Sequence, residues 1–192
     1  SQIPLDAGSK ILYDGITSLS EVIEKCQTAK LLKGAYSAQP PVNVKLAEVF
    51  DYSEPNLTQS INAKKIQIIT PPTDKKIALQ EPALLQSVIR SLLDNAVAYS
   101  PEKSKVTLEA NENGDHIDLA VHDQGKGISK DRQKLLFQPL SKIEGYEDFS
   151  HQGMGFSLYL DKLIMEYMGG SISLESEENM GTHVRLQLPV VA

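Results

Sequence analysis

Residues 106–121 read VTLEANENGDHIDLAV, and apolar and polar side chains alternate on both sides of Asn113-Gly114. This alternation is typical of strands with one buried face, and Asn-Gly is favoured in tight hairpin turns. The segment therefore predicts two paired antiparallel strands, 106–110 and 117–121. A sheet that is buried on both faces would be continuously apolar, so we expect helices on only one face of this sheet.

A long amphipathic helix is predicted upstream of the hairpin, over residues 82–98. Its apolar residues recur at steps of three and four and form a wide stripe, which consists of Leu84, Leu85, Val88, Ile89, Leu92, Leu93, Ala96 and Val97. Asn95 is placed on this stripe by helical geometry, because it follows Leu92 by three residues. A buried amide without a partner costs about 1–3 kcal/mol, so we expect something to bind Asn95.

The other elements are predicted from the same periodicities and from glycine and proline. We expect helices at 9–33, 46–64, 130–137 and 153–168, and strands at 42–44, 66–69, 77–79, 171–175 and 182–188. Pro55 should kink or split its helix, or begin a new one. The order predicts an α+β two-layer sandwich: a mixed, mostly antiparallel sheet with helices on one face, plus an N-terminal helix. A domain boundary is predicted near residue 40, which separates 1–40 from 41–192.

Composition and charge exclude several classes of protein. The chain has 192 residues, and 19 Lys plus Arg against 25 Asp plus Glu give a net charge of −6. No basic run exceeds two residues, so no nucleic-acid partner is expected. No apolar stretch is close to the roughly 18 residues of a membrane span, and we expect a cytoplasmic fragment without membrane contact. The single cysteine, Cys26, cannot form an internal disulfide.

Three short glycine-containing clusters are candidates for ligand binding: DQGKGI (123–128), GMGFSL (153–158) and GT (181–182). Glycine lets a backbone approach a ligand closely, and free amides at a helix start can bind an anion. Each cluster taken alone is also compatible with an ordinary turn or with close packing. The spacings of a P-loop and of a dinucleotide-binding fold are both absent from the sequence.

Taken in order with LLDNAVAY (92–99) and LFQP (136–139), these clusters resemble the conserved boxes of a known family. They are similar to the asparagine, first glycine, phenylalanine, second glycine and glycine-threonine boxes of the ATP-binding domain of two-component sensor histidine kinases, in the GHKL superfamily. The resemblance covers residues 42–189. It implies a five-stranded sheet backed by three helices, with ATP bound under a lid of residues 138–152 that Phe137 anchors.

The resemblance also implies a role for each matching residue. Asn95 would give an oxygen to Mg²⁺, and Ser91 would act through water. Asp123 would accept from the adenine amino group, with Thr182 close by, and Tyr99 and Ile128 would contact the base. In the first glycine box, Gly125 and Gly127 would allow the nucleotide to approach the backbone closely. The second glycine box would close on the phosphates with Gly153, Met154, Gly155 and Phe156.

The implied reaction is phosphoryl transfer from Mg-ATP to a histidine outside this chain, with no catalytic side chain within it. The helix at 9–33 resembles the second helix of a dimerisation hairpin, and the histidines all fall later in the sequence, at His116, His122, His151 and His183. The expected partners are the phosphoacceptor helix of the same receptor, a cognate response regulator and, in the full-length protein, a second copy. The parent receptor could be membrane-anchored.

Ser91, Ala98 and His151 depart from the family pattern and support the first of two alternatives. One is a degenerate domain that binds nucleotide weakly and serves as an interaction module. The other is an ATP hydrolase of the same superfamily. Such hydrolases carry a water-activating glutamate at the position of Ser91, so the sequence disfavours efficient hydrolysis.

Overall fold

The computed structural model describes residues 41–51, 53, 55–71, 76–79, 82–138 and 157–189. The helix predicted over 9–33 and the boundary near residue 40 lie outside these ranges. None of the described helices is both long enough and apolar enough to cross a bilayer.

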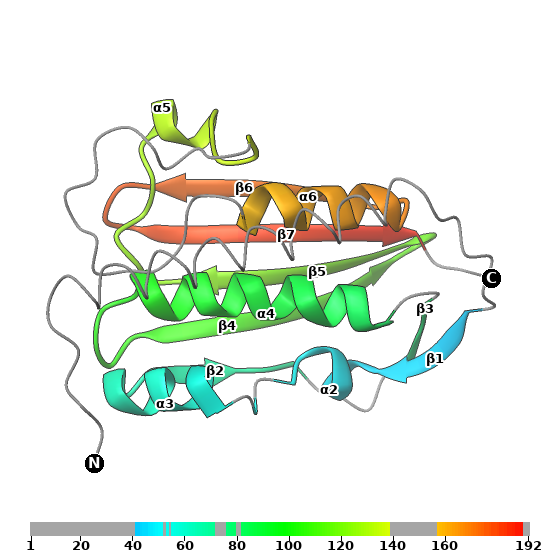
Figure 1. Cartoon of the computed structure of the whole chain (residues 1–192), viewed down its shortest axis with the longest axis horizontal. Helices are drawn as coiled ribbons and strands as arrows, with labels where there is room; N and C mark the ends of the chain where they lie inside the picture. The colour runs from blue at the N-terminus through cyan, green and yellow to red at the C-terminus, as the bar shows by residue number, and fades with distance from the viewer. Residues whose placement is uncertain are drawn as a thin grey trace, which may run out of the picture.

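Five strands form the main sheet, in the spatial order β2-β4-β5-β7-β6 (Figure 1). Their bounds are β2 (Gln67–Ile69), β4 (Lys105–Asn113), β5 (His116–Asp123), β6 (Ser171–Glu177) and β7 (Gly181–Pro189). Only β2 and β4 pair in parallel, and the other neighbours are antiparallel. Two further strands, β1 (Val42–Lys45) and β3 (Lys76–Leu79), pair with each other in a separate antiparallel ribbon. The prediction of a mixed, mostly antiparallel sheet is confirmed.

Three helices cover one face of the sheet (Figure 1): α3 (Pro55–Lys64), α4 (Pro82–Tyr99) and α6 (Ser157–Tyr167). Alternate sheet residues that face them are buried, among them Leu108, Leu119 and Leu186. The predicted two-layer architecture is therefore confirmed. Two single-turn helices, α2 (Leu46–Val49) and α5 (Lys130–Gln133), complete the described elements.

Most local predictions agree with the structure to within a few residues. Seven residues of the α4 stripe are buried, from Leu85 to Val97, and Pro55 begins α3 after a break from α2. The predicted helix at 130–137 is shorter than expected, because α5 ends at Gln133 and a series of turns follows. Gly169 has a φ of 73° and follows α6, as the Gly169-Gly170 pair predicted.

The β4–β5 turn differs from the prediction by one residue. Asn113 pairs with His116, so the two-residue loop is Gly114-Asp115 rather than Asn113-Gly114. Gly114 has a φ of 66°, whereas Asp115 is not among the residues with positive φ. A turn that needs positive φ only at its first central position favours glycine there.

The last turn of α4 is capped by a lysine from α3. The Lys64 ammonium donates to the carbonyl oxygens of Val97, Ala98 and Ser100 at 2.8, 2.7 and 3.0 Å. A cation at a helix C-terminus satisfies carbonyls that have no partner within the helix and interacts favourably with the helix dipole. This contact fixes the end of α4 relative to α3.

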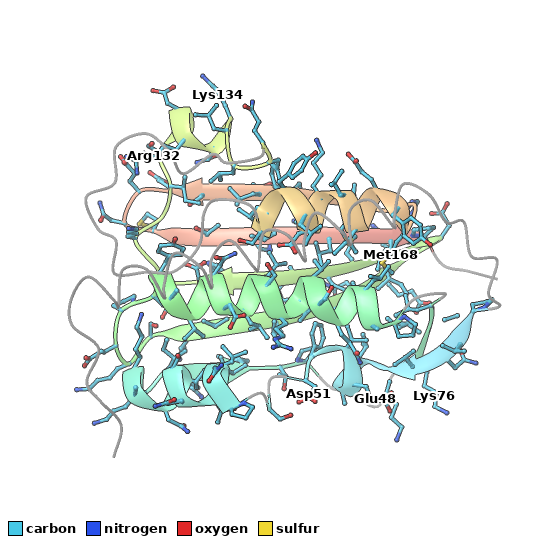
Figure 2. All side chains as sticks on the ribbon, viewed as in Figure 1. Glu48, Asp51, Lys76, Arg132, Lys134 and Met168 are labelled. Atoms are coloured by element: carbon cyan, nitrogen blue, oxygen red, sulfur yellow. The ribbon has the colours of Figure 1, made fainter. Side chains whose placement is uncertain are left out.

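Lys64→Met should lower the free energy of unfolding by about 1–3 kcal/mol, because three part-buried carbonyls lose a charged donor. Urea unfolding followed by circular dichroism measures the change. Lys76→Met is the matched control, since Lys76 is exposed at the edge of the molecule (Figure 2). It should change stability by no more than about 0.5 kcal/mol. Equal effects of the two substitutions would contradict the capping role.

Candidate functional site

The predicted site residues come together at one end of the molecule. The C-terminal end of α4 carries Asn95 and Tyr99, the last residue of β5 is Asp123, and β7 begins at Gly181-Thr182. Figure 1 shows these three chain segments at the same end of the two layers, beside the β6–β7 turn and α5. Figure 2 labels Arg132 on α5 and Lys134 in the turns that follow this helix.

Asp123 is a buried carboxylate with one oxygen fixed by the backbone. The residue is only 8% exposed, and Oδ1 accepts hydrogen bonds from the amides of Gly125 at 2.7 Å and Thr182 at 3.2 Å. Within the described part of the chain, nothing donates to Oδ2. Burial raises the pKa of Asp123 above its ordinary value, although the two amide hydrogen bonds and His122 oppose the rise. Oδ2 can therefore accept from a donor on a bound molecule.

The loop after β5 is packed against the protein itself. A side chain at position 125 would come within 2.7 Å of Asp123 Oδ1 and 2.8 Å of the Tyr99 carbonyl oxygen. At Gly127 a side chain would overlap the carbonyl of Glu177, the last residue of β6 before the β6–β7 turn. The amide of Asn179, in the same turn, donates to the Lys126 carbonyl at 2.7 Å. Both glycines are thus needed for internal packing, and their close approach to a nucleotide stays a prediction.

Gly127→Ala should destabilise the protein and weaken nucleotide binding, because Gly127 combines a φ of 65° with the overlap at Glu177. We expect a loss of about 1–3 kcal/mol in stability and at least a tenfold loss in affinity for an ATP analogue, roughly 1.4 kcal/mol. Gly114→Ala is the matched control, since Gly114 has a φ of 66° with nothing within 4 Å. The Gly114→Ala variant should lose stability but keep its affinity for the ATP analogue. If Gly127→Ala bound the analogue as tightly as wild type, the proposed role of the loop after β5 in nucleotide binding would be contradicted.

Asn95 and Tyr99 lie one helical turn apart on α4, and both are half-buried. Asn95 therefore stands at the edge of the apolar stripe rather than deep within it. The Lys126 ammonium lies 5.1 Å from the centroid of the Tyr99 ring, within the range of a cation–π contact. Among the described residues, no group of three or more His, Cys, Asp or Glu could hold a metal ion.

Ser91 binds the neighbouring helix. Its hydroxyl donates to Asp161 Oδ2 on α6 at 2.8 Å, and Asp161 is only 2% exposed. The pair links α4 to α6 one turn before Asn95. The hydroxyl proton of Ser91 is therefore used within the protein, and its predicted contact through water would have to be made by its lone pairs.

The remaining predicted residues fall into two groups. Ile128 and Thr182 are described: Ile128 is half-buried, Thr182 is 9% exposed, and both contact Ser176 on β6. The second glycine box lies outside the described residues, with Gly153, Met154, Gly155 and Phe156, as does the predicted lid (138–152) except for its first residue. Ser176 and Asp161 were missed by sequence reasoning, because no local pattern marks them.

Comparison with known proteins identifies a family to which most of the described chain is similar. Residues 80–192 match the sequence profile of the family described as "Histidine kinase-, DNA gyrase B-, and HSP90-like ATPase". The sensor-like histidine kinase SenX3 of Mycolicibacterium smegmatis is 32% identical over 118 residues, which are 62% of this chain and 30% of that protein. A methyl sulfide methyltransferase-associated sensor of Methanosarcina acetivorans is 32% identical over 105 residues, or 55% of this chain and 10% of that protein. The chain thus spans less than a third of the length of these relatives.

Solved structures show the same fold. The Acinetobacter baumannii histidine kinase AdeS superposes with a TM-score of 0.76 at 17% identity, covering 100% of this chain and 88% of that chain. The mycobacterial sensor histidine kinase MprB superposes with a TM-score of 0.62 at 23% identity, covering 78% of this chain and 97% of that chain.

Proposed function

Because this chain belongs to the family of histidine kinase-, DNA gyrase B- and HSP90-like ATPases, we propose that it is the catalytic and ATP-binding portion of a sensor histidine kinase. The observation that carries the proposal is Asp123, a buried carboxylate with one oxygen held by two amides and the other available to a ligand. The relatives that match it include proteins named as sensors and as a sensor-like histidine kinase, which supports the same function.

In this proposal the adenine amino group donates to Asp123 Oδ2, and Thr182 contacts the same edge of the base. Tyr99 and Ile128 pack against the base from α4 and from the glycine loop. The second glycine box, residues Gly153, Met154, Gly155 and Phe156, binds the phosphates. Ser91 contributes indirectly, because its bond to Asp161 holds α6 against α4.

The donor set at Asn95 fits Mg²⁺. A half-buried carboxamide oxygen is a hard ligand, and Mg²⁺ is commonly held by few protein groups together with substrate phosphates and water. When bound, Mg²⁺ would neutralise charge on the phosphates; this chain contributes Asn95 and the orientation of the base.

The phosphoacceptor is a histidine outside this chain, on a helix of the same receptor. The chain acts by holding the nucleotide so that the imidazole can attack the γ-phosphorus in line, which is catalysis by positioning. Residues 1–40 would form the second helix of the dimerisation hairpin, and 41–192 the ATP-binding domain. In this proposal the full-length receptor is a homodimer, and this portion of it lies in the cytoplasm. A response regulator is the final acceptor of the phosphoryl group.

Titration of this chain with a fluorescent ATP analogue, with and without Mg²⁺, tests the proposed function. We expect saturable binding that is strengthened by Mg²⁺ and is displaced by unlabelled ATP. If no saturable binding occurs under either condition, the proposal fails and an interaction module becomes the better explanation.

A further inference from the structure

Ser176 on β6 links the candidate base-binding residues to the glycine loop. Its hydroxyl oxygen accepts from the Ile128 amide at 2.9 Å, donates to the Gly181 carbonyl at 2.8 Å and lies 3.0 Å from Thr182 Oγ1. Gln133 holds this arrangement in place, because its side-chain amide donates to the carbonyls of Ile128 and Ser176, each at 2.7 Å. Ser176 therefore has a fixed position and a nearly complete set of partners.

The number of protons in this network fixes the direction of one hydrogen bond. A serine hydroxyl has a single proton, and the Gly181 carbonyl, which can only accept, takes it. The contact between Ser176 and Thr182 must then be donated by Thr182. The Thr182 hydroxyl proton is directed at Ser176, so only lone pairs of Thr182 Oγ1 remain for a ligand.

We propose that Ser176 is a specificity-determining residue for the nucleotide base, because it orients the hydroxyl of Thr182 as an acceptor. This inference rests on the proposed function, in which the base lies against Asp123 and Thr182. Both residues then present acceptors, namely Asp123 Oδ2 and Thr182 Oγ1. A 6-amino group on a purine can donate to them, whereas a 6-oxo group would face two acceptors without any proton between them. The site thus selects adenine over hypoxanthine or guanine.

Adenosine and inosine diphosphates provide the test, since they differ in the 6-amino and 6-oxo groups and in the protonation of N1. Both affinities are measured by competition with a fluorescent nucleotide on this chain. Wild type should prefer the adenine nucleotide. Ser176→Ala should reduce that preference by about tenfold, because the freed Thr182 hydroxyl can rotate and donate to a 6-oxo group.

Two further variants separate base selection from a loss of structure. Ser173→Ala makes the same change at an exposed position on the same strand and should leave the preference unchanged. In a Thr182→Val background, where no hydroxyl remains to be oriented, Ser176→Ala should no longer change the preference. Circular dichroism checks that each variant is folded.

The outcomes distinguish this inference from the proposed function. If wild type binds both nucleotides and Ser176→Ala weakens them equally, the preference is unchanged and Ser176 acts only on loop structure, which overturns the inference. A persisting effect of Ser176→Ala on the preference in the Thr182→Val background would also overturn it. If wild type binds neither nucleotide, the proposed function fails and the inference fails with it.

Discussion

Asp123→Asn is expected to reduce the affinity for adenine nucleotides by about a hundredfold or more, roughly 2.7 kcal/mol or above. The amides of Gly125 and Thr182 require an acceptor at Oδ1, so the asparagine must place its oxygen there. Its NH₂ group then replaces Oδ2 and points donors at the donor of the base. A buried donor that faces a donor loses the hydrogen bond and leaves both groups unsatisfied. Titration with a fluorescent ATP analogue measures the loss.

The same variant should not be less stable than wild type at pH 7. Burial raises the pKa of Asp123 in the folded state, so the folded protein binds this proton more tightly than the unfolded chain does. The stability that protonation contributes is full below the unfolded pKa and is lost as the pH rises through the folded pKa. At pH 7 the buried charge therefore costs stability, and a neutral asparagine removes that cost. A melting temperature clearly below that of wild type would mean that lost binding reflects lost structure.

Asn95→Asp is expected to weaken strongly the Mg²⁺-dependent binding of the ATP analogue. The substitution adds a negative charge at a half-buried position beside the proposed triphosphate site, and like charges that are partly shielded from water repel strongly. It also replaces the neutral ligand of the metal. We expect at least a tenfold weaker affinity in Mg²⁺, and the largest loss at low salt, where screening is weakest.

Asn113→Asp is the control for the added charge. Asn113 is exposed at the end of β4, in the hairpin at the opposite end of the molecule from the site (Figure 1). The Asn113→Asp substitution changes the net charge by the same amount as Asn95→Asp. It should leave the affinity for the ATP analogue and its dependence on Mg²⁺ as in wild type. If Asn95→Asp bound the analogue with wild-type affinity and the same response to Mg²⁺, Asn95 could not be the metal ligand.

Local patterns were sufficient to predict most of the described fold. Alternation on both sides of the Asn-Gly turn gave β4 and β5, and the four-residue steps from Leu85 to Val97 gave α4. These features depend on which face of one element is buried, and that information is local in the sequence. The one-residue shift of the hairpin turn arose because glycine, not asparagine, occupies the position that requires positive φ.

The contacts between site residues could not be predicted in the same way. Asp123, Thr182 and Ser176 meet because β5 pairs with β7 and β7 pairs with β6 in one particular register. The bond between Ser91 and Asp161 depends on how α4 packs against α6. Such contacts join residues that are far apart in the chain, and hydrophobic periodicity carries no information about them. The resemblance to a family identified Asp123 and Thr182, but it did not reveal Ser176 or the cap that Lys64 forms on α4.

A crystal structure of this chain with Mg²⁺ and a non-hydrolysable ATP analogue tests the central claim most directly. We expect the 6-amino group of adenine to donate to Asp123 Oδ2, while the Asn95 carboxamide oxygen ligates the metal on the same nucleotide. A nucleotide bound elsewhere, or one that touches only one of these two side chains, would contradict it.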